Sequence, residues 1–216
     1  MTTRTRKRRT WRVIGIIIIA VALVALWRNA RLIYNRAHDA YFTRAAYPQT
    51  DLADLVADYQ ESHPGAIDKQ IVIDKSDGVL QVFVNGELLK RYAVTQGPVP
   101  ERDKEVEGDM ATPEGEFYVS RKNPRSSFHK FLGVSYPTME DAERGLRDRL
   151  ITRAEYERVV RAAERRQEPP QNTRLGGNIG IHGGACRTIG CISLTDDEID
   201  ELYGFADLGT QIVIRK

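Results

Sequence analysis

A thiol and an imidazole lie close together in a glycine-rich run near the C-terminus. His182 is followed by Gly183 and Gly184, and Cys191 follows Gly190. A thiol is a strong nucleophile only as the thiolate, and a neighbouring histidine can remove its proton. Glycines let the backbone turn sharply, so that its N–H groups can face an oxyanion. One short loop therefore combines a nucleophile, a base and a possible oxyanion hole.

Each reactive residue also has a plain structural interpretation. A histidine at a strand end is often only a hydrogen-bonding group, and a buried cysteine usually behaves as a small apolar side chain. A second thiol, Cys186, lies five residues before Cys191, and the two can form a disulfide in an oxidising compartment. A cysteine placed for packing has no need of a glycine loop, so we favour catalysis. Cys186 lacks a preceding glycine, which makes Cys191 the preferred nucleophile.

The sequence implies neither a metal nor another cofactor. Its four histidines are scattered, and no Cys/His spacing matches a zinc site. The net charge of +2 comes from a basic N-terminal cluster, and the remaining residues are slightly acidic. We therefore do not interpret the charge as a nucleic-acid footprint.

The N-terminal residues have the pattern of a membrane anchor. Residues 1–12 carry six basic side chains and no acidic one, and an uncharged apolar run follows over residues 13–27. With Trp11 and Trp27 at its ends, the run approaches the roughly 17 residues that a membrane helix needs. Basic residues stay in the cytoplasm. We therefore expect a single-pass protein of the inner (cytoplasmic) membrane, with its main domain on the periplasmic or extracytoplasmic side.

A cleaved signal peptide is the alternative for this segment. Its cleavage site requires small residues just after the apolar core. Leu26, Trp27 and Arg28 are instead bulky or charged, which favours a retained anchor.

The rest of the chain divides into a helical linker and a β domain. Over residues 28–68, apolar side chains recur at helical spacing, with a break at Pro48 and a helix cap at Asp51. This pattern predicts a stalk or a helix lying on the domain. Residues 69–216 begin with alternating segments around Asn85-Gly86, a strong hairpin signal. Strands are expected over residues 71–73, 79–84, 87–95, 112–120, 178–182 and 211–215.

Helices interrupt the β pattern twice. Residues 139–167 contain two capping boxes, at Thr138 and Thr152, and predict an inserted helical pair that is either surface decoration or a lid. A third capping box at Thr195 begins another helix, which Gly204 can end. The predicted fold class is thus mainly β and mostly antiparallel, with a few helices.

The motifs around the two reactive residues resemble those of the L,D-transpeptidase catalytic domain family (YkuD-like), in its YafK-like branch. The matching pieces are Ile181-His182-Gly183, Thr188-Ile189-Gly190-Cys191-Ile192 and Thr112-Pro113-x-Gly115-x-Phe117. The Asn123-Pro124 and Ser135-Tyr136-Pro137 segments also resemble that branch. The resemblance covers residues 69–216 and implies a β-sandwich-like catalytic domain with a cysteine nucleophile.

The resemblance implies a role for each matching residue. Cys191 matches the nucleophile and His182 the general base, which the backbone carbonyl of Gly183 orients. The N–H groups of Gly190 and Cys191 match the oxyanion hole. Thr188 stands where the family usually has serine, and Ser193 where it commonly has arginine. The candidate substrate-binding residues are Arg187, Thr188, Ser193 and Tyr136.

Together these features predict a peptidoglycan-modifying enzyme of cell wall biogenesis that acts on stem peptides through a thioester at Cys191. An incoming amine gives an L,D-transpeptidase, and water gives a hydrolase: a carboxypeptidase, an endopeptidase or an enzyme that releases an attached protein. The residues do not separate these outcomes. An alternative of another class is a non-catalytic, membrane-tethered peptidoglycan-binding protein with Cys186 and Cys191 bonded. A papain-like protease would need a third orienting residue and a helix-borne cysteine, and neither is evident.

Overall fold

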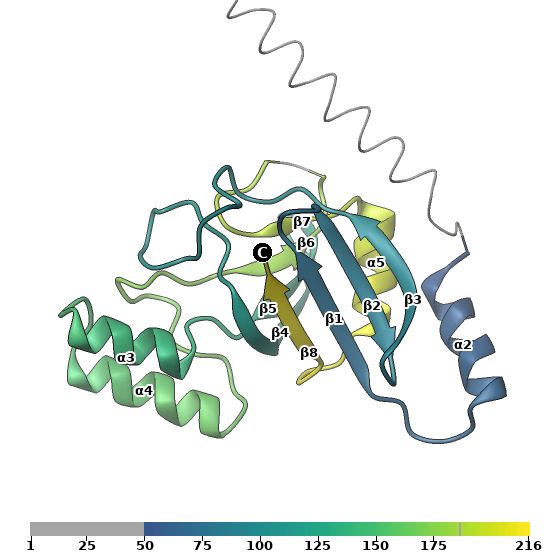
Figure 1. Cartoon of the computed structure of the whole chain (residues 1–216), viewed down its shortest axis with the longest axis horizontal. Helices are drawn as coiled ribbons and strands as arrows, with labels where there is room; N and C mark the ends of the chain where they lie inside the picture. Colours follow the sequence, from purple (N-terminus) through teal and green to yellow (C-terminus); the bar gives the residue numbers. More distant parts are fainter. Residues whose placement is uncertain (1–49, 186) are drawn as a thin grey trace, which may run out of the picture. The chain divides into compact units, whose positions relative to one another are not determined.

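Eight β-strands form one mixed sheet, in the order β3-β2-β1-β8-β4-β5-β6-β7 (Figure 1). The computed structural model describes residues 50–185 and 187–216. The strands are β1 Lys69–Asp74, β2 Val79–Val84, β3 Glu87–Ala93, β4 Gly115–Ser126, β5 His129–Val134, β6 Gly180–His182, β7 Ile192–Ser193 and β8 Gln211–Arg215. The mainly β domain with inserted helices that the sequence predicts is confirmed.

The β2–β3 hairpin forms where local sequence predicts it. Alternate residues of β2, Leu80, Val82 and Val84, are fully buried, as expected for a strand with one face on the core. The turn residues Asn85 and Gly86 both have positive φ, 49° and 80°, which suits the tight turns that join hairpin strands.

The long strand β4 makes the sheet curl, in place of two separate stacked sheets. The first four of its twelve residues pair with β8, and residues from Val119 onward pair with β5. The register shifts between Val119 and Arg121, and such an irregularity bends a strand. Two strand pairs, β1–β8 and β6–β7, are parallel. The other five pairs are antiparallel, so the expected mostly antiparallel pairing is confirmed. Local alternation carries no information about a partner's direction, and the two parallel pairs were not predicted.

Helix α5 (Asp196–Phe205) covers the inner face of the curl (Figure 1). Its buried residues Ile199, Leu202 and Phe205 join one core cluster with residues from β1, β2, β4, β6 and β8. The predicted capping box at Thr195 is present. The helix continues one residue past Gly204, because burying the Phe205 side chain outweighs the helix-breaking tendency of glycine.

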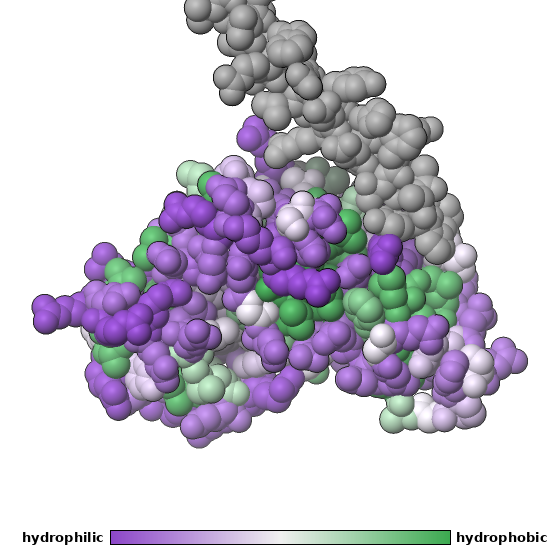
Figure 2. All heavy atoms as spheres, in the orientation of Figure 1, coloured by the Kyte–Doolittle hydropathy of each residue, from purple (hydrophilic) through white to green (hydrophobic). Residues whose placement is uncertain are grey.

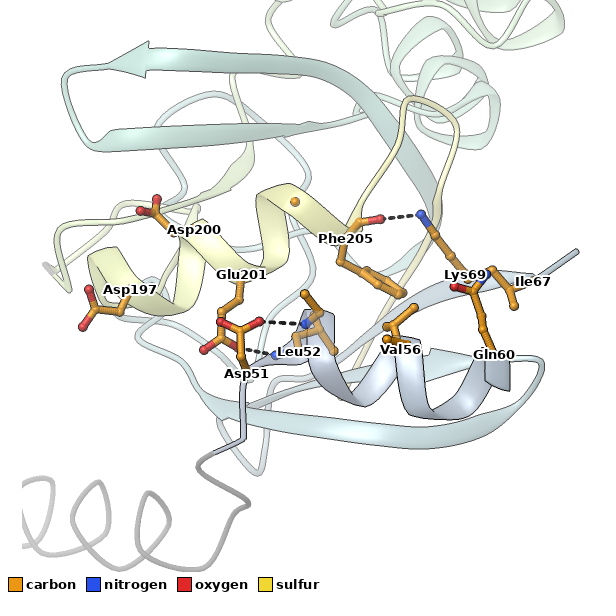
Figure 3. A pocket seen from close by; sticks show the side chains of 13 residues that line it. Asp51, Leu52, Val56, Gln60, Ile67, Lys69, Asp197, Asp200, Glu201 and Phe205 are labelled. Atoms are coloured by element: carbon orange, nitrogen blue, oxygen red, sulfur yellow. Dashed lines mark hydrogen bonds between the residues drawn. The ribbon is translucent and has the colours of Figure 1, made fainter. Parts of the chain in front are cut away.

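Helix α2 (Leu52–Ser62) lies on the domain, and Asp51 caps it as predicted. The Glu201 carboxylate of α5 accepts hydrogen bonds from the Leu52 amide at 3.2 Å and from the Tyr92 hydroxyl at 2.8 Å, and it pairs with Lys90. Figure 3 shows this junction beside a cleft of about 830 Å³ between α2 and α5. These contacts fix α2, which belongs to the predicted linker, to the domain that follows it.

The helical insertion consists of α3 (Met139–Arg147) and α4 (Arg153–Glu164), both with the predicted capping boxes. The pair has a small core of its own, formed by Ala142, Ile151, Val159 and Leu175. Hydrophilic residues cover most of its visible surface in Figure 2. The pair is thus a separately packed, solvated extension at one end of the sheet.

Two buried lysines organise the loop before β4. Lys75 is 1% exposed, and its Nζ donates to the carbonyls of Arg102 and Thr112 and to the Glu114 carboxylate, at 2.6, 2.9 and 2.8 Å. A buried ammonium group without such partners would cost several kcal/mol. The loop therefore has one favourable arrangement around this cation.

The second lysine fixes the next part of the same loop. Lys104 Nζ pairs with Asp109 at 2.8 Å, and both side chains are buried. The Asp109 carboxylate also accepts from the amides of Glu105, Val106 and Ala111. Burial would raise the pKa of Asp109, but these hydrogen bonds outweigh it and lower the pKa.

The predicted tail over residues 1–12, the anchor over residues 13–27 and the first part of the 28–68 linker lie outside the described residues. Among the helices within residues 50–185 and 187–216, none combines the length and apolar character needed to cross a bilayer.

Replacing the first buried lysine tests whether it organises the loop. We expect Lys75→Met to lower the free energy of unfolding by about 2 kcal/mol, because several acceptors lose their buried cation. The partial exposure of Glu114 moderates the loss. The control is Arg153→Met, which removes an exposed ion pair to Glu157 and should change stability by less than about 0.5 kcal/mol. If chemical denaturation showed the same loss of stability for both variants, the role of Lys75 in organising the loop would be contradicted.

Candidate active site

The sheet places His182 at the end of a short buried strand. In β6, His182 lies opposite Phe131 of β5 on one side and opposite Ser193 of β7 on the other. Only 3% of the residue is exposed. Pairing on both sides holds its backbone, so the imidazole has a defined position in the sheet.

One hydrogen bond sets the tautomer of the imidazole. His182 Nδ1 lies 2.7 Å from the Gly183 carbonyl oxygen, which can only accept. Nδ1 therefore carries the proton, and in the neutral ring Nε2 keeps its lone pair. Burial lowers the pKa of His182 below 6.5, although the hydrogen bond to Gly183 opposes the shift. At neutral pH the ring is thus unprotonated at Nε2 and suited to accept a proton.

Two aromatic rings pack on this imidazole. The Phe128 ring stacks on it with 4.6 Å between centroids, and the Phe131 ring lies 6.4 Å away and nearly parallel. Phe128 belongs to the tip of the β4–β5 hairpin and is 47% exposed. The imidazole is therefore covered by a side chain that is itself partly in solvent.

Cys191 lies directly before β7, the strand that pairs with β6. In that pairing His182 is opposite Ser193, two residues after Cys191. The thiol is partly buried, and its Sγ donates to the Asn178 carbonyl at 3.3 Å. The structure thus places the Cys191 thiol beside the segment that leads into β6, the strand that carries His182.

The turn before Cys191 is held from both sides. Thr188 Oγ1 donates to the Cys191 carbonyl at 2.6 Å. Gly190 has a φ of +130°, and a Cβ there would lie 2.9 Å from the Ala111 carbonyl oxygen. A residue with a side chain would therefore be both strained and too close to the loop that Lys104 and Asp109 organise. The buried ion pairs of that loop thereby support the turn.

The backbone at Gly183 is crowded by two other elements of the fold. A Cβ there would lie 2.6 Å from Asp196 Oδ1, 2.9 Å from Ile199 Cγ2 and 3.0 Å from the Phe128 carbonyl oxygen. Helix α5 and the β4–β5 hairpin therefore both approach the one residue whose carbonyl orients His182. Asp196 also accepts a hydrogen bond from the Gly184 amide at 2.7 Å.

The remaining predicted site residues occupy varied positions. Arg187 is exposed, and Ser193 is buried with its backbone paired to Thr95. Tyr136 is fully buried, and its hydroxyl donates to the Leu175 carbonyl at 2.9 Å. Its side chain therefore supports the chain before β6 instead of facing a ligand. Cys186 lies outside the described residues.

Three contributors to the site have no motif in the sequence: the Phe128 ring, the Asn178 carbonyl and the Asp196 carboxylate. Phe128 contacts His182, the Asn178 carbonyl accepts from Cys191, and Asp196 binds the amide of Gly184, two residues after His182. No group of three potential metal-ligating side chains comes together within the described part of the chain.

The crowding at Gly183 leads to a stability prediction. We expect Gly183→Ala to lower the free energy of unfolding by about 1–3 kcal/mol, because the added methyl group must displace α5 or the hairpin. Gly204→Ala is the matched control, since its Cβ would meet nothing within 4 Å and alanine favours a helix. If denaturation curves gave the same free energy of unfolding for both variants, this account of the crowding would be wrong.

Comparisons with known proteins agree with this architecture. The family model described as "L,D-transpeptidase catalytic domain" (YkuD) matches residues 68–214. No curated protein matches the chain closely enough to count as a relative. The predicted YafK-like branch stays a prediction.

Several solved structures are similar to this chain at low sequence identity. An L,D-transpeptidase from Xylanimonas cellulosilytica is 13% identical, with a TM-score of 0.42, over 70% of this chain and 62% of the other. The helical cell shape determining protein Pgp2 from Campylobacter jejuni, as a K307A mutant, is 20% identical, with a TM-score of 0.49, over 78% and 57%. This chain thus spans about three-fifths of their lengths. The family match alone covers most of the chain, and by it the protein belongs to the L,D-transpeptidase catalytic domain (YkuD) family.

Proposed function

We propose that this protein is a cysteine acyltransferase that modifies peptidoglycan stem peptides, with Cys191 as nucleophile and His182 as general base. Family membership supports an enzyme that acts on peptidoglycan. The observation that carries the residue assignment is the hydrogen bond from His182 Nδ1 to the Gly183 carbonyl. It leaves Nε2 as the proton acceptor, and Cys191 directly precedes β7, the strand that pairs with that of His182.

The first half-reaction forms a thioester. His182 Nε2 takes the thiol proton, and Cys191 Sγ attacks the carbonyl carbon of an L,D-configured bond at the diaminopimelate residue. The N–H groups of Gly190 and Cys191 stabilise the oxyanion of the tetrahedral intermediate. When the intermediate collapses, the C–N bond breaks and His182 returns the proton to the leaving amine.

The second half-reaction determines the product. An acceptor amine, deprotonated by His182, attacks the thioester and forms a cross-link or attaches a protein. Water in the same place gives hydrolysis. We propose transpeptidation as the main activity, because the matching family model describes an L,D-transpeptidase catalytic domain. Arg187 and Thr188 flank the nucleophile turn, and we include both among the proposed substrate contacts.

The proposal includes a compartment. Peptidoglycan lies outside the cytoplasmic membrane, and an anchor over residues 13–27 with a basic cytoplasmic tail would place the catalytic domain there. A cleaved signal peptide would deliver the same domain to the same side.

Incubation with muropeptides and mass spectrometry test this function directly. We expect new cross-linked dimers with the wild-type chain and none with Cys191→Ala, and we expect Cys186→Ala to retain activity. If the products were trimmed peptides without dimers, the protein would be a hydrolase and not a transpeptidase. If Cys191→Ala gave the same products as the wild type, the enzyme assignment would be wrong. That result would favour the alternative of a non-catalytic peptidoglycan-binding protein.

The pH dependence of turnover tests the role of His182. Because burial lowers the pKa of this imidazole below 6.5, it stays neutral from alkaline pH down to that value. We expect kcat/KM to remain level in this range and to fall only at lower pH. His182→Gln should lower kcat/KM by about 10²- to 10⁴-fold and remove the acid limb. An unchanged acid limb in His182→Gln would assign the titration to another group.

A further inference from the structure

We propose that Phe128 and Asp200 are positioning residues for His182, and that Asp200 clamps the hairpin tip that carries Phe128. The proposal rests on the assignment of His182 as general base, although its test does not need turnover. Neither residue belongs to a motif that the sequence singles out. Both act through contacts that only the folded chain makes.

The first contact is between rings. The Phe128 ring stacks on the imidazole at 4.6 Å between centroids and 29° between planes. It shields part of the ring from water and limits its rotation about the side-chain bonds. Almost half of Phe128 is exposed, so the surrounding core does not hold it in place. The stack therefore depends on the position of the hairpin backbone.

The second contact links that backbone to the same histidine. The Gly183 amide donates to the Phe128 carbonyl at 3.0 Å, with a longer contact of 3.3 Å to the Lys130 carbonyl. The Gly183 carbonyl in turn accepts from His182 Nδ1. Phe128 thus reaches His182 by its ring and by two consecutive hydrogen bonds. A shift of the tip would disturb both.

The third contact holds the tip itself. One Asp200 oxygen, Oδ1, lies 2.6 Å from His129 Nε2 and 2.8 Å from Lys130 Nζ. The hydrogen bond from Lys130, together with that from His129, lowers the pKa of Asp200. His129 has a φ of +68°, a left-handed conformation that is unfavourable for a residue other than glycine. The residue after Phe128 therefore depends on outside contacts to hold its conformation.

The clamp has a counterpart one turn earlier on α5. Asp196 accepts from the Gly184 amide at 2.7 Å, and residues four apart share a helix face. The same face of α5 thus holds the hairpin tip through Asp200 and the segment after His182 through Asp196. Figure 3 shows Glu201 pointing toward α2, while Asp200 leaves the opposite side of the helix.

Several titratable groups lie on the elements that pack around His182. They come from the hairpin, from α5 and from the turn before β7. Any test by titration must therefore separate a change of position from a change of charge. The groups are His129, Lys130, Cys191, Asp196 and Asp200.

The test is a titration of the His182 imidazole by NMR in the full-length chain, with the His182 signal identified by its loss in His182→Gln. The variants are Phe128→Ala and Asp200→Asn. We expect the pKa of His182 to rise toward 6.5 in both, because water gains access to the ring. We also expect kcat/KM to fall for Asp200→Asn, and its acid limb to move to higher pH.

Two controls make the result specific. Asp197→Asn removes the same charge from an exposed position on the same helix and should leave the titration unchanged. Phe128→Tyr keeps the stacked ring and should therefore keep the wild-type pKa of His182. Thermal melts establish that each variant is folded, as the partial exposure of both side chains leads us to expect.

An unchanged His182 titration in folded Phe128→Ala and Asp200→Asn would overturn the proposal. An equal shift in Asp197→Asn would also overturn it, because the effect would then be one of charge. If the pKa shifts appear as expected but no variant and no wild-type sample converts muropeptides, the proposed function fails and the positioning role stands.

Discussion

The close approach of two elements to the backbone of Gly183 is the constraint on which the site depends. Its amide binds the hairpin, its carbonyl binds His182, and its α-carbon lies against helix α5. A side chain at this position would separate elements that must touch. Because the same residue sets the imidazole tautomer, the packing of this region and the protonation pattern of the ring are decided at one place. The pairing of β6 on both sides keeps this point fixed relative to the sheet.

The supports of the turn before Cys191 lie further away and are mainly electrostatic. Lys75 and Lys104 are buried cations whose partners belong to the loop before β4, and that loop touches Gly190 through the Ala111 carbonyl. Buried ion pairs add little net stability, but they are costly to break. They therefore favour one loop conformation over others. In this domain such pairs hold the backbone where the oxyanion is expected to form.

Much of the fold could be predicted because local rules decide it. The capping boxes at Thr138, Thr152 and Thr195 each begin a helix, and Asn85-Gly86 makes the hairpin. Strand β5 and the parallel pairs could not be predicted in the same way. The partner and direction of a strand depend on residues distant in sequence, and alternation does not encode them. Tyr136 shows the same limit within the site, since its motif did not reveal that the side chain is buried.

The sequence by itself indicated the family, the proposed reactive pair and the glycines beside it, because each is a matter of residue type and short spacing. Only the tertiary structure decided which imidazole nitrogen carries the proton, since a carbonyl must face Nδ1 at 2.7 Å. It also decided that Phe128 and α5 surround His182. These contacts join β5, β6 and α5 across more than fifty residues of chain. Hydrogen bonds and ring contacts act over a few ångströms, so only a folded chain can specify them.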